Sequence, residues 1–572
     1  MKSKLHFLSG WKLGRGRSVG FGWNPRIGAA VGFGWNSRRW GMVGLLAAAV
    51  VSAVFSSPKW GISLLAWVYP IPLLIVFRRM TIRRKVLWVF AALEVGHFLS
   101  DYKVAPFPVP VLLLFGVYQS LEQLALYWMD AWVCRRTDRF AVTLFFPAFA
   151  VALEYFNTVY GGGIWWSVAN SQYRLSWLAQ LASVTGIWGI SFLLYWTASV
   201  VVWAVGRGRK GRLAAGVGIY AGVLALVLGV GGYRYSGAGG GAKTARVAGV
   251  TVPLIGLWQT FYQDYCGQRI DLDPRAAVTD PAMRKIGLAE ASYIEHADTV
   301  RFRNVVATIR AVDDSLFALS QRAVDRGAGI VCWSENNGIA WKADEDAFIK
   351  RGQRFAAGNK VYLLMTICVV NPGKITPGKK SLENEAILAG PEGTILTRFY
   401  KNNPVPMVEA SQPGDGIIPV VKTAYGRLAV SICYDADFPL QMRQVGDKGA
   451  DLLLLPSGDW YAISPFHTYM AVYRGVENGC SVFREVSNGL SLATDYRGKA
   501  IGSRDWFRDG RSLWLVDMPI GHVSTIYGRI GDILPCGCLL YAFVTVVLLV
   551  VVRNRRPAVL LATDRTALQP LS

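Results

Sequence analysis

The sequence predicts a two-part fold: a multi-span α-helical membrane domain of about eight helices, joined to one α/β domain. Of the 572 residues, 52% are hydrophobic and only 17% are charged, a balance that favours a membrane protein. Eight long apolar stretches supply the candidate spans. Between the seventh and the eighth, residues 245–525 alternate short β-branched runs with helical patterns, which is typical of an α/β unit with a largely buried sheet.

The apolar stretches define the membrane domain. They lie near residues 40–57, 60–77, 86–101, 106–128, 140–159, 187–205, 213–232 and 533–552. Most approach the roughly 20 residues that a helix needs to cross a bilayer. Pro70 and Pro72 interrupt the second stretch, so its ends are poorly defined. We predict about seven helices over 40–232 and a last helix over 533–552.

Positive charge follows the connections between these stretches. The N-terminal arm 1–39, the segments 78–85, 134–139 and 206–212, and the tail 553–572 together hold 24 Lys or Arg and 2 Asp or Glu, a net +22 of the total +23. Every second connection is therefore basic, as the positive-inside rule requires of a cytoplasmic face. We predict cytoplasmic termini, an N-terminus that is not cleaved, an outward-facing α/β domain and no nucleic-acid partner.

Three strand ends in the α/β domain carry reactive side chains. Glu335 closes "GIVCWSE", Lys401 follows "TILTRFY", and Cys433 follows "RLAVSI". Acyl transfer needs a nucleophile, a base and a cation for the tetrahedral oxyanion, and these residue types supply that set. Each also has a purely structural interpretation, as a packing thiol or a solvated loop charge. The eight cysteines show no zinc-ligand spacing and no paired framework, so we predict no metal and no cofactor.

Longer motifs surround these residues. "YKNNPVPMVE" places Glu409 eight residues after Lys401, and the run 459–498 keeps the order Asp-Trp, His, Arg, Glu, Arg, Asn-Gly, Asp, Gly. "TIYGRIGD" leads into the last apolar stretch, and "LAQLASVTGIWGISFL" lies in the membrane half. Glu335, Lys401 and Cys433, in that order along the chain, resemble the Glu-Lys-Cys triad of the nitrilase (carbon–nitrogen hydrolase) superfamily, and the longer motifs resemble segments of its members. Over roughly residues 40–550 the chain resembles its membrane-embedded bacterial branch, the apolipoprotein N-acyltransferases.

The resemblance implies an αββα sandwich over 245–525 and a location in the bacterial plasma (inner) membrane. It implies that Cys433 takes an acyl chain from a membrane phospholipid as a thioester and passes it to the N-terminal amine of a diacylglyceryl-cysteine apolipoprotein. Glu335 is then the general base, and Lys401 with the N–H of Tyr434 stabilises the oxyanion. One copy of the chain, a monomer, is expected to suffice.

Three further residues receive weaker roles from the resemblance. Glu409 and Asp435 are second carboxylates expected to orient Lys401 or to steer the incoming amine, and Trp460 is expected to line the acyl or lid region. Asp435 and Ser334 depart from the family pattern, which usually has Glu and Pro at these positions.

Two other functions remain open from the sequence. One is a membrane-anchored amidase or lipid hydrolase that uses the same triad with water as acceptor, and the other is a transporter or scaffold with an inactive domain. The intramembrane Glu94, His97, Glu122 and Glu154 either bond between helices or meet lipid head groups, because buried charge in a membrane is expensive.

Overall fold

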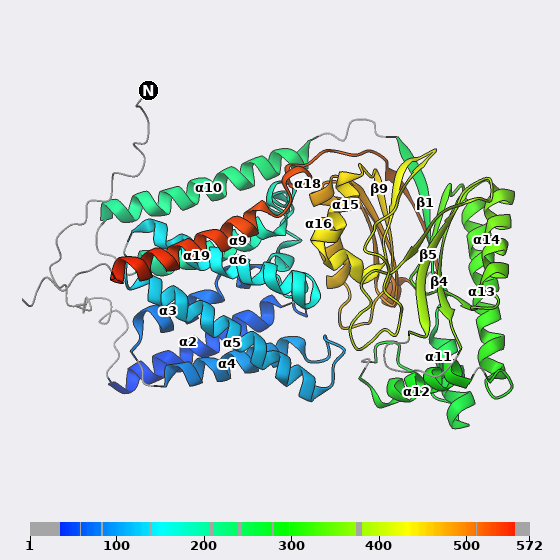
Figure 1. Ribbon diagram of the computed structural model, residues 1–572, viewed down its shortest axis with the longest axis horizontal. Coiled ribbons are helices and arrows are strands. Elements are labelled where there is room, and N and C mark those ends of the chain that lie inside the picture. The colour runs from blue at the N-terminus through cyan, green and yellow to red at the C-terminus, as the bar shows by residue number, and fades with distance from the viewer. Residues whose placement is uncertain are drawn as a thin grey trace, which may run out of the picture.

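The computed structural model has a bundle of helices at one end and a layered β-sandwich at the other (Figure 1). It describes residues 35–554 except 58, 82–83, 138, 206–209, 238–242, 277–278, 297, 373–379 and 511. The predicted combination of a helical membrane domain and an α/β domain is confirmed. Most of the basic arm, with its "VGFGWN" repeat, and most of the tail lie outside the described residues.

Each of the eight apolar stretches contains a helix. These are α2 (Trp35–Ser56), α3 (Pro70–Arg79), α4 (Lys85–Asp101), α5 (Val109–Cys134), α6 (Phe145–Asn157), α9 (Ile187–Val205), α10 (Lys210–Ser236) and α19 (Ile533–Asn554). Among the described residues, five helical segments are long and apolar enough to cross a membrane, those over 109–134, 140–162, 187–205, 213–236 and 533–551. The predicted count of about eight spans is therefore not confirmed.

Proline explains why one predicted span is short. The stretch 60–77 divides into a 3₁₀ turn, Ser63–Trp67, and helix α3, which begins at Pro70. Proline has no N–H to donate and its ring clashes with the preceding turn, so it is tolerated at the first helical position but not further inside. The helix that results has 10 residues.

The bundle alternates in direction, so that one end carries the basic connections. Arg78 and Arg79 end α3, and Arg135 caps α5, at the end away from the sandwich. Arg78 donates to both oxygens of the buried Asp130 on α5, at 2.6 and 2.8 Å. This bidentate pair joins two helices where an unpaired buried charge would be costly.

The α/β domain contains two sheets. The first has seven strands, in the order β13-β1-β2-β4-β5-β6 with β3 paired to β4. Its strands are β1 (Thr244–Val250), β2 (Ile330–Trp333), β3 (Gly338–Trp341), β4 (Tyr362–Val370), β5 (Leu382–Ala389), β6 (Ile395–Tyr400) and β13 (Leu513–Pro519). The second has six, ordered β12-β11-β10-β9-β8-β7. They are β7 (Val420–Thr423), β8 (Gly426–Val430), β9 (Leu452–Gly458), β10 (Ser481–Ser487), β11 (Leu490–Thr494) and β12 (Ala500–Asp505).

Helices cover the outer faces of both sheets and complete four layers (Figure 1). Helices α13 (Arg303–Val324) and α14 (Glu345–Asn359) cover the first sheet, and α15 (Pro439–Asp447) and α16 (Phe466–Asn478) cover the second. The α15–α16 layer faces the membrane helices. Two more helices, α11 (Ile255–Cys266) and α12 (Pro281–His296), form a small cluster of their own beside α13.

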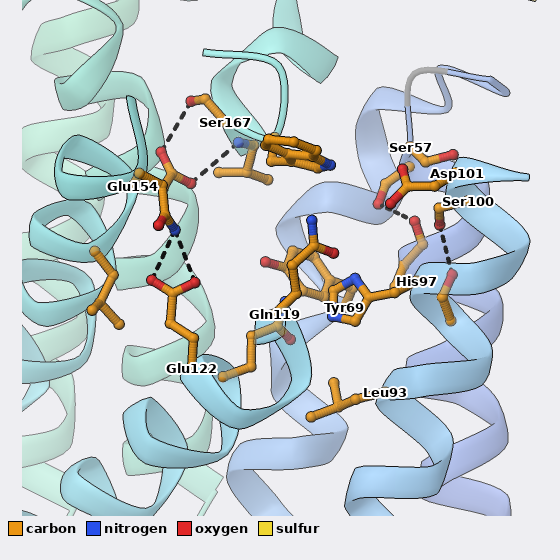
Figure 2. A pocket seen from close by; sticks show the side chains of 18 of the residues that line it. Ser57, Tyr69, Leu93, His97, Ser100, Asp101, Gln119, Glu122, Glu154 and Ser167 are labelled. Carbon is orange, nitrogen blue, oxygen red and sulfur yellow. Dashed lines mark hydrogen bonds between the residues drawn. The ribbon is translucent and has the colours of Figure 1, made fainter. Parts of the chain in front are cut away.

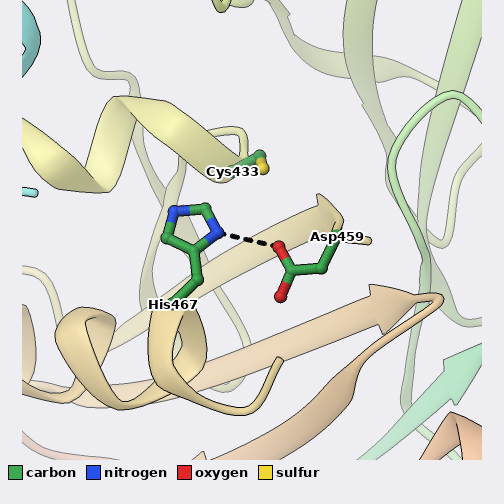
Figure 3. Close-up of side chains that lie close together, drawn as sticks. All are labelled: Cys433, Asp459 and His467. Carbon is green, nitrogen blue, oxygen red and sulfur yellow. Dashed lines mark hydrogen bonds and ion pairs between the residues drawn. The ribbon is translucent and has the colours of Figure 1, made fainter. Parts of the chain in front are cut away.

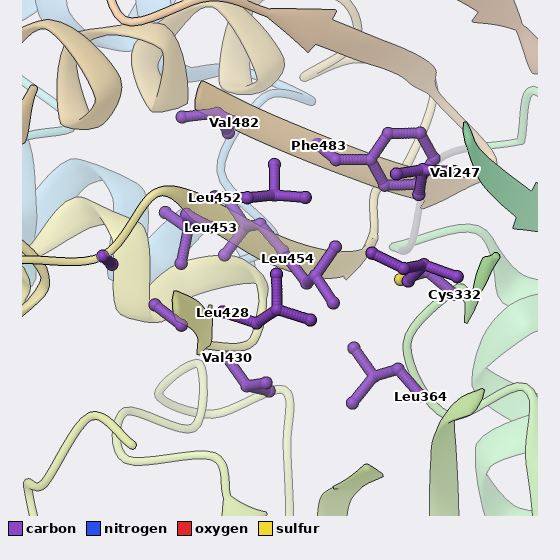
Figure 4. Close-up of a cluster of buried hydrophobic side chains, with 14 of the residues drawn as sticks. Val247, Cys332, Leu364, Leu428, Val430, Leu452, Leu453, Leu454, Val482 and Phe483 are labelled. Carbon is purple, nitrogen blue, oxygen red and sulfur yellow. The ribbon is translucent and has the colours of Figure 1, made fainter. Parts of the chain in front are cut away.

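The main core lies between the two sheets (Figure 4). Val247 and Leu364 of the first sheet pack against Leu454 and Phe483 of the second, and each is almost fully buried. The strands carry apolar side chains on both faces because one face meets the opposite sheet and the other meets helices. This explains why the central strands are continuous apolar runs in the sequence, such as "DLLLLP".

We expect Leu454→Ala to lower the free energy of unfolding by about 2–5 kcal/mol, because Leu454 is fully buried between the sheets and its truncation leaves a cavity. Thermal unfolding of the purified full-length protein measures this as a lower midpoint. The matched control is Leu288→Ala, since Leu288 on α12 is 54% exposed. Equal midpoints for the two variants would contradict the assigned core.

Candidate active site

Glu335 lies immediately beyond β2 and is held by residues from both sheets. Its Oε1 accepts a hydrogen bond from Asn384 Nδ2 of β5 at 2.7 Å, and its Oε2 accepts one from the N–H of Gly458, at the end of β9, at 2.7 Å. The Glu335 carboxylate is therefore anchored between the facing sheets and only 6% of the residue is exposed.

Lys401 follows β6 and is completely buried. Its Nζ donates to Glu335 Oε1 at 2.7 Å and to Glu409 Oε1 at 2.5 Å. Burial alone disfavours the ammonium, but the negative charges of Glu335 and Glu409 outweigh it and raise the pKa of Lys401 well above its usual value. Lys401 is therefore a permanent cation at this position.

Cys433 stands at the turn where β8 passes into a short 3₁₀ helix, Cys433–Asp437. Its φ of +47° lies in the left-handed region, which costs a non-glycine residue of the order of 1–2 kcal/mol. Its Sγ lies 3.6 Å from the carbonyl oxygen of Gly458, the residue whose N–H binds Glu335. The thiol and the carboxylate are thus arranged around one residue of β9.

The electrostatics of the site keep the resting thiol protonated. Burial and the nearby charge of Glu335 raise the pKa of Cys433, while Lys401 and Arg484 oppose that shift without cancelling it. Burial also raises the pKa of Glu409 to about 7. A thiol in this environment needs a base to become a nucleophile, and Glu335, whose charge acts on the thiol, is the base that the sequence predicts.

Asp435 accepts hydrogen bonds mainly from backbone N–H groups. Among the described residues, it forms no hydrogen bond with the Lys401 ammonium. Its oxygens accept from the N–H groups of Asn402, Asn403 and Ile432 at 3.3, 2.7 and 3.3 Å, and from Asn403 Nδ2 at 3.0 Å. It therefore ties the loop after Lys401 to the turn that carries Cys433. Burial raises its pKa to about 6. Of the two carboxylates expected to orient Lys401, only Glu409 touches it.

His467 and Asp459 lie beside Cys433 (Figure 3). His467 Nδ1 and Asp459 Oδ1 are 2.7 Å apart, and Arg484 donates to the same oxygen at 3.1 Å. The ligand atoms of Cys433, Asp459 and His467 lie within 4.8 Å of one another. The donor set suits a metal ion poorly, because Asp459 already binds His467 and the Arg484 cation.

The membrane domain contacts the site directly. The hydroxyl of Tyr434 donates to the carbonyl of Gly162 at 2.6 Å, and the N–H of Ile164 donates to the carbonyl of Asp437 at 2.9 Å. Gly163 lies between them with φ of +71°, and a Cβ there would stand 2.7 Å from the Asp437 carbonyl oxygen. Only glycine fits at this close approach.

Trp460 forms a second contact with the membrane domain. Its indole Nε1 donates to the carbonyl of Val104, in the loop between α4 and α5, at 3.0 Å. The site therefore lies at the junction of the two domains.

The structure thus brings together the three side chains predicted from the sequence. Glu409, Tyr434, Asp435 and Trp460 also lie around them, though with different contacts. Sequence reasoning missed Asn384 and Gly458, which hold Glu335. The signal for Asn384 was an uncharged amide inside the strand "LENEAILA", where a side chain that is 1% exposed needs a partner.

The sandwich and its site define a carbon–nitrogen hydrolase class of protein, and residues 305–525 match the family model described as carbon-nitrogen hydrolase. Residues 47–200 match the model described as the apolipoprotein N-acyltransferase N-terminal domain. The chain belongs to the apolipoprotein N-acyltransferase family within the nitrilase superfamily.

Relatives cover both domains. The apolipoprotein N-acyltransferase of Geobacter metallireducens is 26% identical over 543 residues, which span 89% of this chain and 94% of that protein. The apolipoprotein N-acyltransferase of Shewanella oneidensis is 23% identical over 469 residues, 76% of this chain and 80% of that one. Among solved structures, an amidase from Nesterenkonia sp. aligns with 18% identity over 50% of this chain and 95% of its own, with a TM-score of 0.33.

The raised pKa of Asp435 predicts that the folded protein loses stability as the pH rises. An unfolded Asp ionises near pH 3.9, whereas buried Asp435 keeps its proton until about pH 6. The resulting stabilisation is fully present below pH 3.9 and is lost as the pH rises through 6, a change of about 3 kcal/mol. Asp435→Asn should therefore reduce the fall in thermal midpoint between pH 4 and 6.5.

The control for this experiment is Asp517→Asn. Asp517 is an exposed residue whose pKa is lowered by its hydrogen bonds with Arg246, so above about pH 5 it is ionised in both the folded and the unfolded state. Its replacement should leave the slope of midpoint against pH between about pH 5 and 6.5 unchanged. A slope for Asp435→Asn equal to that of the wild type would contradict the assignment of a buried, protonated carboxyl.

Proposed function

We propose that the protein is an N-acyltransferase that moves a fatty acyl chain from a membrane phospholipid, through a thioester on Cys433, to the N-terminal amine of a diacylglyceryl-cysteine apolipoprotein. The observation that carries this proposal is the buried Lys401–Glu335 pair, 2.7 Å apart, together with the Cys433 turn, whose Tyr434 binds Gly162 of the membrane domain. Membership of the family supports the choice of substrates.

The first half-reaction forms the thioester. Glu335 takes the thiol proton, and the Cys433 sulfur attacks the ester carbonyl of the phospholipid. The oxyanion of the tetrahedral intermediate lies near the Lys401 ammonium and the N–H of Tyr434 at the start of the 3₁₀ helix. When the C–O bond breaks, the leaving lysophospholipid oxygen takes the proton back from Glu335.

The second half-reaction forms the amide. The neutral α-amine of the acceptor attacks the thioester carbonyl, and Glu335 takes a proton from the attacking nitrogen. Collapse of the second tetrahedral intermediate breaks the C–S bond, and the proton on Glu335 passes to the leaving sulfur. The site returns to its starting state, as a ping-pong scheme requires. Glu409 holds Lys401 in place throughout, and Asp435 holds the loop after Lys401 against the Cys433 turn.

We also propose that the 245–525 domain faces the outside of a bacterial plasma membrane, with both termini in the cytoplasm. The arginines at the ends of α3 and α5 support this orientation, because they lie at the end of the bundle away from the sandwich. All the proposed catalytic side chains come from one chain, so one copy has a complete site.

The first half-reaction can be tested by trapping. The purified protein is incubated with phospholipid carrying a labelled sn-1 chain, and hydroxylamine-sensitive label is located by peptide mapping. We expect label on Cys433, none in Cys433→Ser, and a rate lower by about 10²–10⁴-fold in Glu335→Gln, since a general base contributes that much. Cys368→Ser, which changes a cysteine on β4, is the matched control. A labelled Cys433→Ser protein would refute the nucleophile.

The second half-reaction distinguishes a transferase from a hydrolase. Adding a diacylglyceryl-cysteine peptide to the labelled wild-type protein should move the label into an amide that resists hydroxylamine. Release of free fatty acid at the same rate with and without the peptide would instead assign the site to a lipid hydrolase or amidase that uses water. A wild-type protein that never acquires label would contradict both activities.

A further inference from the structure

The membrane domain contains a pocket that the triad does not explain (Figure 2). It has a volume of about 230 Å³ and lies among α2, α4, α5 and α6. That volume is far more than the roughly 10–15 Å³ that one water needs on a comparable scale. Its lining includes Gly163, Trp165 and Phe466. Gly163 abuts the Asp437 backbone and Phe466 precedes His467, so part of the pocket wall lies against the 3₁₀ turn Cys433–Asp437.

The charged groups of this pocket are all acidic apart from a histidine. Asp101, Glu122 and Glu154 line it, and no Lys or Arg is among its described lining residues. The Glu154 carboxylate accepts four hydrogen bonds, from Ser167, Ser191, Tyr195 and the N–H of Val168. Of the two roles considered for the intramembrane acids, Glu154 therefore has the first, a hydrogen bond between helices. Glu122 accepts from a single nitrogen, Asn157 Nδ2, at 2.8 Å from both of its oxygens.

Four lining side chains carry buried polar atoms with no hydrogen-bond partner among the residues described. They are Gln119 Oε1, His97 Nε2, Ser57 Oγ and Trp166 Nε1. Gln119 is 93% buried, since only 7% of the residue is exposed. Gln119 Oε1 can only accept, and a buried acceptor without a donor costs free energy, so it points to a ligand that supplies a donor. The Ser57 hydroxyl can donate or accept, and Trp166 Nε1 can only donate.

A primary ammonium group fits this set of atoms. It carries three N–H donors and no acceptor, so it can satisfy Gln119 Oε1 and a Glu122 oxygen together, and its charge matches the acidic wall. The aromatic rings of Phe115 and Trp166, whose centroids are 5.3 Å apart, also line the pocket and favour a cation. A phosphate is disfavoured, because its negative charge would face Asp101, Glu122 and Glu154 and it has no donor for Gln119 Oε1.

We propose that this pocket binds the primary ammonium group of a lipid substrate and holds that lipid beneath Cys433. The inference rests on the proposed function, which supplies two lipid sources of such a group: the head group of an aminophospholipid donor and the α-amine of the diacylglyceryl-cysteine acceptor. Either lipid would keep its chains in the bilayer while its polar end reaches the pocket.

The donor arm compares phosphatidylethanolamine with phosphatidylglycerol carrying the same acyl chains, in the full-length protein. The measured quantity is the ratio of the two rates of thioester formation. If the donor supplies the ammonium, Glu122→Gln and Gln119→Leu each lower this ratio by about tenfold. Two different substitutions are used so that poor folding of one leaves the test intact.

The acceptor arm starts from enzyme loaded with acyl chain from phosphatidylglycerol. The measured quantity is the KM for a diacylglyceryl-cysteine peptide. If the acceptor supplies the ammonium, the same two variants raise this KM by about tenfold. The matched control in both arms is Glu94→Gln, since Glu94 lies outside the pocket, against Gly116 and Ser120 of α5. Equal behaviour of Glu122→Gln, Gln119→Leu and Glu94→Gln in both arms would overturn the proposal.

A binding measurement separates this inference from the proposed function. Octadecylamine should raise the thermal midpoint of the wild-type protein more than octadecanol does, and Glu122→Gln should abolish that difference. If the wild-type protein forms no thioester but is stabilised more by octadecylamine than by octadecanol, the ammonium site is supported and the proposed acyltransferase activity is refuted. If octadecylamine and octadecanol act alike on the wild type, the ammonium site is refuted whatever the activity.

Discussion

The buried ion pair between Lys401 and Glu335 is the constraint on which the rest of the site depends. Taking two charges out of water costs several kcal/mol for each ion, and only close geometry and further hydrogen bonds offset that cost. Here Glu409, Asn384 and the N–H of Gly458 supply them. Asn384 comes from the first sheet and Gly458 from the second, so Glu335 gains both hydrogen bonds only when the sheets are packed face to face. The inter-sheet core therefore serves the chemistry by holding the two sheets in one alignment.

The cost of buried charge also explains why the acidic residues of the site have different partners. Glu335 and Glu409 share one buried ammonium and hold the lysine as a cation, while burial and the charge of Glu335 raise the pKa of the neighbouring thiol. Asp435 stands apart from this cluster and binds backbone N–H groups. Its shorter side chain suits that task, because the groups it binds lie within its own turn and in the loop beside it. The departure from the family pattern at this position thus falls on a residue that organises loops.

Much of this arrangement could be predicted from the sequence, and the remainder has identifiable reasons. Glu335, Lys401 and Cys433 could be singled out from the sequence because each lies shortly after an apolar strand. Glu335 and Lys401 follow strands of the first sheet and Cys433 follows a strand of the second, so it was the family resemblance that joined them into one predicted site. Asn384 was not, since an amide inside a strand gives no sign of which residue it will meet across a sheet. The contact between Tyr434 and Gly162 joins positions 272 residues apart, a separation that no local pattern encodes. The predicted count of about eight spans is not confirmed, and one local reason is that the helix beginning at Pro70 has only 10 residues.

The hydrogen bond from Tyr434 to Gly162 has a consequence for the physical setting of the site. Gly162 lies at the end of the helical segment 140–162, one of the candidate spans, and the next residue but one binds the Asp437 carbonyl. The length and tilt of a spanning helix adjust to the thickness of the surrounding hydrocarbon. We therefore expect the position of the turn that carries Cys433 to depend on the thickness of the bilayer as well as on the sandwich. The length of the surrounding lipid chains would then influence the geometry of the site.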